Sequence, residues 1–554
     1  MGRGRSAFWG NAALLAVAPL LALAVFSAAL AGGFVHDDHR QIVGNPLVQS
    51  LSHLPALFTS GVWAGAGSGS SWYRPLMMSS FALDRALFGP GALGFHAVQL
   101  ALFAIVAALA VRCMTVFGAP ASVALLAGAL GAVHPAQAEV AAWISARCDS
   151  LLAAAALAAL LLYDRALAAT SARARGLLQI GVGVAFFAAL CSKESAVALA
   201  PLFVCVDRVR GARFTPRAIA ARHAAWLLAL GVYLALRAHS LGGVSGGLLA
   251  PMDPLAILGA FGQAAVRIVV PIALTISPTP PAPWHAAFGG VVAFGACGAF
   301  ALAWRRRSPL LVPIALAAAP LAIAALGAAR IGEMADRYLL LPIFATAWLV
   351  AAGIASLPAP FRVAGFVAGA AAVATFAIAA STHVRVYAND ESLWTDAWAK
   401  NPHSLRAAAN LGALHLDRNE PYRATEWLDR AAALAPGDAE IEMNRAVASE
   451  QQGDARSARQ RLEALLASQP SYWPAAVRAG HLALAAEEWN AAGEHYEAAL
   501  RVHPLAAEAW AGLGVAREKQ GRKDDARRAL SRALALDPQV QNADALRRLL
   551  ERLG

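Results

Sequence analysis

Long apolar runs recur through the first two thirds of the chain and constrain its fold more than any other feature. Residues 1 to about 383 are rich in Ala, Leu, Val and Gly, whereas residues from about 388 onward are polar and charged. In a bilayer every backbone polar group must be satisfied internally, so runs of this kind fold as helices. The sequence therefore predicts an all-α polytopic membrane domain over residues 1–386, followed by a second domain over residues 387–554.

Eleven segments of the first domain are apolar enough to be predicted as membrane spans. The first follows Arg3 and Arg5 and ends near Ala31; it is long for the apolar region of a signal peptide, so we expect a retained span. The other ten lie near residues 92–111, 121–133, 150–163, 177–191, 195–206, 222–240, 286–304, 309–327, 338–356 and 361–382.

Basic residues between the spans set the expected orientation, because cytoplasmic loops carry an excess of Lys and Arg. A cytoplasmic N-terminus puts every arginine cluster on that side: Arg112, Arg165, Arg173, Arg175, Arg208, Arg210, Arg213, Arg217, Arg305, Arg306, Arg307 and Arg362. The segment 258–276, punctuated by Pro271, does not fit the alternation, so we expect it to be re-entrant or interfacial. The C-terminal domain then lies outside.

The net charge of +11 follows from these arginine clusters. The sequence has no basic stripe with interleaved aromatic residues, so we expect a lipid bilayer and no nucleic acid as a partner. The five cysteines form no CxxC pair, which gives no indication of a zinc site or a disulfide framework. Abundant Ala and Arg with little Lys is typical of a GC-rich bacterial genome, so we expect a multi-pass inner (cytoplasmic) membrane protein with its C-terminal domain in the periplasm.

Two adjacent carboxylates, Asp37 and Asp38, stand where the chain leaves the first span. Neighbouring carboxylates disfavour each other's charge, which raises one pKa and prepares a general base. The simpler interpretation is that Asp38 caps a short interfacial helix and Asp37 is solvated. Because His36 and His39 flank the pair, a divalent metal site is a further alternative that the residues leave open.

Further ionisable residues fall on the same predicted outer face as the acidic pair. The positive-inside rule does not put this many cations there without a role such as holding an anion. They are Arg74, His134, Glu139, Arg147, Asp149, Lys193, Glu194, Glu333, Asp336 and Arg337.

Prolines recur every 34 residues in the C-terminal domain, at Pro402, Pro436, Pro470, Pro504 and Pro538. This interval is the period of tetratricopeptide repeats, each of which is a pair of helices. Small residues at fixed offsets let the paired helices approach closely, and each repeat buries its face only against its neighbours. We therefore expect a four-repeat α-solenoid closed by a polar capping helix over residues 541–553, which presents a groove for a protein or serves as a scaffold.

Five sequence blocks together resemble the transmembrane and tetratricopeptide-repeat protein O-mannosyltransferases and their bacterial relatives. The blocks are Phe34-Val-His-Asp-Asp38 with Asn45; Tyr73-Arg-Pro-Leu76 with Leu87-Phe-Gly89 and Gly94-Phe-His96; His134-Pro135, Glu139 to Arg147 and Asp149-Ser-Leu-Leu152; Cys191-Ser-Lys-Glu194; and Asp336-Arg-Tyr-Leu-Leu-Leu-Pro342. The resemblance implies the C-type glycosyltransferase fold. It also implies transfer of a mannose-like sugar from a polyprenyl-phosphate donor to a Ser or Thr hydroxyl of a protein on the outer face.

Such a transfer needs a base for the acceptor proton and a cation for the leaving phosphate. We expect Asp37 to be the base, with Asp38 as its acceptor or metal partner. The expected donor-phosphate ligands are Arg147, Lys193 and Arg337. Supporting roles are expected for Arg74, His134, Glu139 and Glu194.

Each supporting residue also has a purely structural interpretation. Glu139 and Glu194 either hold the cations in place or form structural ion pairs, Lys193 with Glu194 among them. Arg74 could anchor a loop at Pro75, and His134 could be a satisfied residue at the end of a span. For the whole chain the alternatives are a membrane-tethered scaffold for envelope or polysaccharide assembly, and a transporter or polymerase of lipid-linked substrates.

Overall fold

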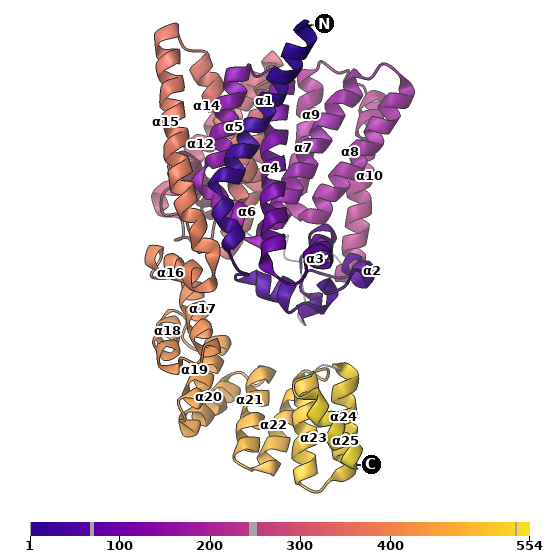
Figure 1. Ribbon diagram of the computed structural model, residues 1–554, viewed down its shortest axis with the longest axis vertical. Coiled ribbons are helices and arrows are strands. Elements are labelled where there is room, and N and C mark those ends of the chain that lie inside the picture. Colours follow the sequence, from indigo (N-terminus) through magenta and orange to yellow (C-terminus); the bar gives the residue numbers. More distant parts are fainter. Residues whose placement is uncertain (1, 67–70, 243–251, 538–539, 554) are drawn as a thin grey trace. The chain divides into compact units, whose positions relative to one another are not determined.

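The computed structural model describes residues 2–66, 71–242, 252–537 and 540–553, and these residues form helices and turns without a β-strand (Figure 1). The chain divides into two compact units, Met1–Asn401 and Pro402–Gly554. Helix α16 (Asp390–Lys400) lies in the first unit, beyond the boundary expected at residue 386. The expected fold class, a helical membrane domain followed by a tetratricopeptide-repeat solenoid, is confirmed.

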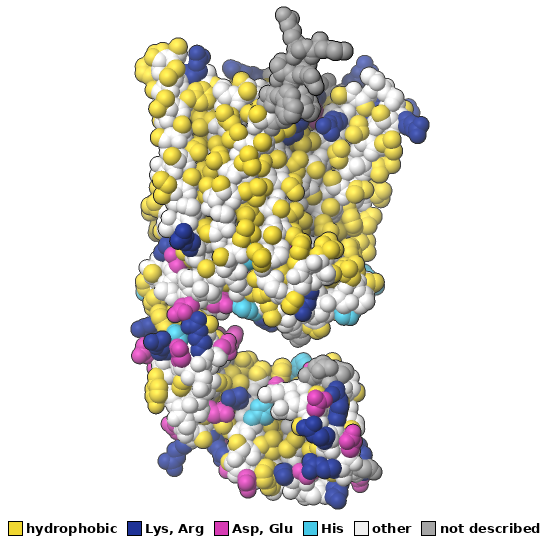
Figure 2. Space-filling view, viewed as in Figure 1, with side chains coloured by type: hydrophobic (Ala, Val, Ile, Leu, Met, Phe, Trp, Pro, Cys, Tyr) yellow, Lys and Arg dark blue, Asp and Glu magenta, His cyan; other side chains and the backbone are white. Residues whose placement is uncertain are grey.

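Eight helical segments in the described part of the chain are long and apolar enough to cross a membrane. They contain α4 (Ala92–Val116), α7 (Arg147–Ala168), α8 (Ala172–Ser192), α10 (Pro216–Leu241), α12 (Pro283–Arg306), α13 (Leu311–Ile331), α14 (Leu340–Ala355) and α15 (Ala359–His383). A ninth is possible in length if α5 (Ala121–Val133) is joined to Pro135–Ala142, from which it is bent by 55°. Figure 2 shows the apolar band that these helices present.

Two of the eleven expected spans differ from this set. Helix α1 (Gly2–Val25) has a described apolar part, Ala13–Val25, that is shorter than a full span. Helix α9 (Ala200–Val209) has only 10 residues, about 15 Å at the rise of an α-helix. The 3-10 helix Glu194–Leu199 in front of it adds roughly 12 Å, so the two elements together come close to the ~30 Å of the hydrocarbon core. The irregular 3-10 turn explains why length alone misjudges this segment.

Helix α11 (Pro254–Val269) covers most of the segment expected to be re-entrant or interfacial; the loop before it is described only from residue 252. It crosses α12 at Gly262 and Gly289. A Cβ added at Gly262 would lie 2.1 Å from the carbonyl oxygen of His285, so only glycine permits this close approach. The non-helical chain that follows is covered by protein, since Thr275 and Ser277 are buried. This agrees with the rule that irregular backbone in a membrane domain needs such cover.

The connection between α1 and α4 forms a cap of short helices. It contains a π-helical turn (His39–Val43), the 3-10 turns Pro46–Val48 and Leu51–His53, and helices α2 (Leu54–Phe58) and α3 (Pro75–Phe88). Their apolar side chains share one core with α4 and α7, which includes Ile42, Leu57, Met77, Phe81 and Phe95. The burial of Ile42 fixes the segment that carries Asp37 and Asp38.

The second unit is an array of paired helices. Its elements are α17 (Leu405–Asp417), α18 (Pro421–Leu434), α19 (Ala439–Gln451), α20 (Ala455–Ser468), α21 (Trp473–Ala485), α22 (Trp489–Val502), α23 (Ala507–Lys519), α24 (Lys523–Leu536) and α25 (Ala543–Leu553). Helix α25 buries Leu546 and Leu549 in a core shared with Leu530 and so closes the array. Pro538 lies outside the described residues.

Within each repeat a small residue of the first helix packs on a large residue of the second. An added Cβ at Gly412 would lie 2.6 Å from Leu428, one at Gly480 2.7 Å from Tyr496, and one at Gly514 2.7 Å from Leu530. The second repeat has Ala446 and Leu462 at the equivalent positions, both buried. The two helices of each repeat can therefore pack closely only because a small residue recurs every 34 residues.

The substitution Gly480→Ala is expected to destabilise the repeats by about 1–3 kcal/mol, because the new methyl group meets the buried Tyr496 ring. The double variant Gly480→Ala/Tyr496→Leu reproduces the Ala and Leu pair of the second repeat and should recover part of the loss. Chemical denaturation of the full chain, followed by the loss of helical circular dichroism, measures both. Unchanged stability of Gly480→Ala would contradict the packing.

Candidate functional site

Asp38 is buried and joins the cap to the start of α7. One carboxylate oxygen accepts hydrogen bonds from the Ser145 backbone N–H (2.8 Å) and hydroxyl (2.5 Å). The other accepts from the Val35 N–H at 3.1 Å. Three donors from two segments that are far apart in sequence make Asp38 a clamp between these segments. It is not the cap of the helical turn that follows it, since its side chain makes no capping bond there.

Asp37, the neighbour of Asp38, keeps 30% of its side-chain surface exposed. Its Oδ1 lies 3.5 Å from Nε2 of His36. His36 has a φ of 51°, in the left-handed region that side chains rarely adopt. A strained residue of this kind is held by its surroundings, and this one orients the carboxylate beside it.

Asp390, at the start of α16, holds the backbone of this strained turn. Its Oδ1 accepts from the His36 N–H at 2.8 Å, and its Oδ2 pairs with Nε2 of His39 at 2.7 Å. Burial alone would raise the pKa of Asp390, but the hydrogen bonds from His39 and from the His36 backbone lower it. The carboxylate thus stays charged and fastens the Asp37 segment to the residues that follow α15.

Burial raises the pKa of Asp38 to about 7, although the bonds from Ser145 and Val35 act in the opposite direction. The folded protein therefore holds a proton at Asp38 that the unfolded chain, with a pKa of 3.8, has released. The stability that Asp38 contributes is then highest below about pH 4 and falls as the pH rises to about 7.

As the pH rises from about 5 to about 8, we expect the wild type to lose stability relative to Asp38→Asn. Thermal unfolding of the detergent-purified proteins across this range measures the difference. Asp37→Asn serves as the control, because it keeps the buried carboxyl of Asp38 and should follow the wild-type dependence. A difference that does not vary with pH would contradict the raised pKa.

Two cations lie on a connected set of aromatic rings that also contacts His36, the residue before Asp37. The guanidinium of Arg337 lies 5.0 Å from the ring centre of Trp143 and 4.8 Å from that of Tyr338. The ammonium of Lys193 lies 4.5 Å from the Tyr338 ring centre. The His36 ring stacks on the Trp143 ring, with 5.5 Å between the two ring centres. A line of ring contacts thus connects the Asp37 segment to both cations.

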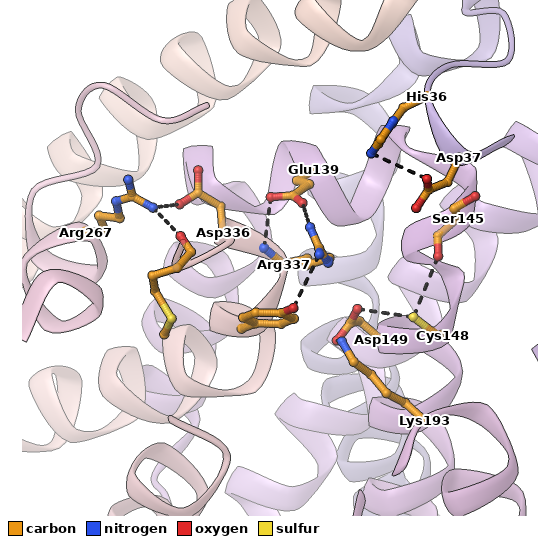
Figure 3. A network of polar contacts seen from close by, with 12 residues as sticks. His36, Asp37, Glu139, Ser145, Cys148, Asp149, Lys193, Arg267, Asp336 and Arg337 are labelled. Carbon is orange, nitrogen blue, oxygen red and sulfur yellow. Dashed lines mark hydrogen bonds and ion pairs between the residues drawn. The ribbon is translucent and has the colours of Figure 1, made fainter. Parts of the chain in front are cut away.

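Each of these cations has a carboxylate partner that fixes its position. Arg337 donates to Glu139 at 2.5 Å through Nη1, and the backbone N–H of Arg337 donates to the other Glu139 oxygen at 3.1 Å. Lys193 donates to Asp149 at 2.6 Å. Figure 3 shows Asp37 with His36, Glu139 with Arg337, and Asp149 with Lys193 as neighbouring pairs. Arg337 keeps 20% of its side-chain surface exposed and Lys193 keeps 8%, whereas the side chain of Arg147 is fully buried.

Arg147 is not part of this group, and the expectation that it binds the donor phosphate does not fit its placement. Its side chain is 0% exposed and forms an ion pair with Asp84 of α3. It also donates to the Phe95 carbonyl at 2.8 Å, and the Phe81 ring centre lies 4.9 Å from the guanidinium. Because its charge is balanced inside the core, Arg147 ties α3, α4 and α7 together and has no open face for a ligand.

The remaining predicted residues take structural positions. Arg74 forms a two-bond pair with Glu194, at 3.0 and 2.7 Å, so Lys193 is not the partner of its sequence neighbour. His134 is buried, pairs with the Ile268 carbonyl at 3.1 Å and accepts from the Ala136 N–H. Both ring nitrogens of His134 thus have hydrogen-bond partners, as in the structural interpretation of this residue from the sequence.

A divalent metal gains no support from the donor set. Among the residues that the structure describes, no three His, Cys, Asp or Glu side chains gather closely enough to hold a metal ion. Of the four residues considered from the sequence, Asp38 is bonded to Ser145 and His39 to Asp390.

Sequence reasoning missed several residues that shape the site. Trp143 and Tyr338 carry the ring contacts, and Asp390 fastens the strained turn. Trp143 and Tyr338 stand inside the quoted blocks, and Tyr338 directly follows Arg337, so an aromatic residue beside a cation was the available signal. No sequence signal pointed to Asp390, because only the fold brings it close to His36.

The fold and the polar cluster define the class of this chain: a polytopic helical membrane protein with a C-terminal tetratricopeptide-repeat array. Residues 477–540 match the tetratricopeptide repeat family. A solved structure, the crystal structure of MamA protein, is 22% identical with a TM-score of 0.24, over 26% of this chain and 80% of that chain.

The resemblance predicted from the sequence is confirmed by curated relatives named protein O-mannosyl-transferase. Tmtc1 of Drosophila melanogaster is 33% identical over 189 residues, which are 33% of this chain and 22% of the relative. TMTC1 of Mus musculus is 38% identical over 164 residues, 28% of this chain and 17% of the relative. TMTC1 of Homo sapiens is 37% identical over 163 residues, 28% of this chain and 18% of the relative. The chain thus spans about a fifth of the length of these relatives.

Proposed function

We propose that this protein is a membrane glycosyltransferase that moves a mannose-like sugar from a polyprenyl-phosphate donor to a Ser or Thr hydroxyl of a protein. The observation that supports this most directly is the line of contacts between Asp37 and the two cations. His36 connects Asp37 to Trp143, and Trp143 contacts Arg337. Tyr338 then joins Arg337 to Lys193. The names of the curated relatives agree with a sugar transfer to protein.

The proposed reaction is a displacement at the anomeric carbon of the sugar. The acceptor oxygen attacks this carbon, the bond to the phosphate oxygen breaks, and the polyprenyl phosphate leaves with the electron pair. Asp37 accepts the hydroxyl proton as the new bond forms. Lys193 and Arg337 stabilise the charge of the leaving phosphate, and Asp149 and Glu139 hold them in position.

In this proposal the two units divide the work of transfer. The membrane unit holds the lipid-linked donor, and the repeats bind the protein acceptor, as an array of stacked helix pairs provides a surface for a polypeptide. The site then lies on the outer face of the inner membrane, with the N-terminus in the cytoplasm and the repeats in the periplasm.

The direct test is an assay with the purified full-length protein in detergent micelles. The donors are mannosyl polyprenyl phosphate and, separately, the corresponding nucleotide sugar, with Ser- and Thr-containing peptides as acceptors. Transfer from the lipid donor alone supports the proposal. Transfer from the nucleotide sugar alone, or none to any hydroxyl, would contradict it.

Lys193→Met is expected to lower the turnover number by about 10²- to 10³-fold, the usual effect of losing one group that stabilises developing negative charge. Because this change leaves Asp149 unpaired, the double variant Lys193→Met/Asp149→Asn should regain stability without regaining activity. Lys193→Arg keeps the charge and should retain part of the rate. Full activity of the double variant would remove Lys193 from the reaction.

A further inference from the structure

An apolar groove lies between three helices of the first unit, outside the candidate site. It has a volume of about 680 Å³ and is lined by residues of α9, α10 and α12, among them Pro201, Val204, Trp226, Ala301 and Trp304. Lys193 and Arg208 mark the two ends of the segment that contains the 3-10 turn and α9. The groove therefore starts within the membrane region and runs towards the end where the arginine clusters lie.

Arginines surround the outer rim of this groove. The two stretches that form it, residues 200–222 and 298–310, contain eight arginines and a single carboxylate, Asp207. Arg208 lies over the Trp304 ring at 5.6 Å and donates to the Trp304 carbonyl at 2.7 Å. The rim arginines of α9 and α12 are close together, since an added Cβ at Gly211 would lie 3.5 Å from Nη1 of Arg307.

Few of these positive charges are neutralised by the protein. Asp207 pairs with Arg222, and Asp164 of α7 pairs with Arg210. In the described part of the chain Arg305, Arg306 and Arg307, all exposed, have no carboxylate within ion-pair distance. Figure 2 shows Lys and Arg side chains at this end of the first unit, beyond the apolar band.

We infer that this groove is a binding site for an anionic phospholipid of the adjacent leaflet. One acyl chain lies in the groove between α9, α10 and α12, and the phosphate contacts the arginine rim. An apolar slot with a cationic rim matches a molecule that is apolar along its chains and negative at its head. The proposal is independent of the sugar transfer, because no residue that lines the groove belongs to the candidate site.

The test compares lipids retained by the full-length protein. Protein purified in detergent is incubated with phosphatidylglycerol or with phosphatidylcholine of the same acyl chains, and bound lipid is counted by native mass spectrometry. We expect the wild type to prefer phosphatidylglycerol by at least about tenfold, since each juxtamembrane cation adds to the attraction for an anionic lipid. Equal retention of the two lipids would overturn the inference.

Two variants separate the groove from general surface charge. Arg305→Gln/Arg306→Gln/Arg307→Gln should reduce the preference to within about twofold. Arg165→Gln/Arg173→Gln/Arg175→Gln removes the same charge from the last turn of α7 and the start of α8 and should preserve the preference. Ala301→Trp fills the groove while keeping every arginine and should abolish retention of the lipid. An equal loss in the two arginine variants, or unchanged retention in Ala301→Trp, would overturn the inference. Unfolding temperatures in lipid-free micelles show that each variant is folded.

Discussion

Asp37→Asn is expected to lower sugar transfer by about 10²- to 10⁴-fold while leaving the protein folded. The amide cannot accept the proton of the acceptor hydroxyl, so the loss should appear in the turnover number and not in donor binding. Folding should be unaffected because the carboxylate is partly exposed and its contact with His36, at 3.5 Å, is long for a hydrogen bond.

The measurement is the rate of transfer from the polyprenyl-phosphate donor, with the unfolding temperature determined on the same preparation. Asp38→Asn is the control variant, with the same substitution at the adjacent residue. It disturbs the hydrogen bonds from Ser145 and Val35, so its main effect should be on stability. Asp37→Glu tests whether a carboxylate at a slightly longer reach restores part of the rate. Wild-type turnover in Asp37→Asn would exclude Asp37 as the base.

Arg147→Met is expected to destabilise the membrane unit by about 3–5 kcal/mol, the usual cost of leaving one partner of a buried ion pair unpaired. Asp84 would remain in the core without its cation, and the Phe95 carbonyl would lose a donor. The effect should be seen in denaturant unfolding of the purified protein and in its yield from membranes.

The double variant Arg147→Met/Asp84→Leu removes both charges and should recover most of this stability, because an apolar pair of similar volume replaces the ion pair. Its donor affinity should stay near that of the wild type if Arg147 is purely structural. A double variant that is stable but no longer binds the donor would return Arg147 to the group of phosphate ligands.

The fold could be predicted largely from the sequence because its determinants are periodic. The apolar runs define helices that must satisfy their own backbone, and the small residues at 34-residue spacing reappear as the Gly412, Gly480 and Gly514 contacts. The segment 194–209 was harder, since its first turn is a 3-10 helix whose rise per residue is greater than that of an α-helix. Composition does not report this difference.

The candidate site could be predicted only in outline. The positive-inside rule separates the cations on the two faces of the membrane, and it predicts Lys193, Arg337 and Arg147 on the same outer face. It does not say which cation faces a ligand and which is buried with a partner. That choice depends on Asp84, 63 positions before Arg147, and on Asp149, 44 positions before Lys193.

The bond between Asp390 and the His36 turn joins two points of the chain that are 354 positions apart. A ribosome has therefore completed all the candidate membrane spans of the described residues, the last of which ends at Ala388, before the residue that secures this turn emerges. A nascent or truncated chain that stops before Asp390 holds the Asp37 carboxylate on an unsecured turn. The bond thus couples the conformation of the Asp37 segment to completion of the membrane-embedded part of the protein.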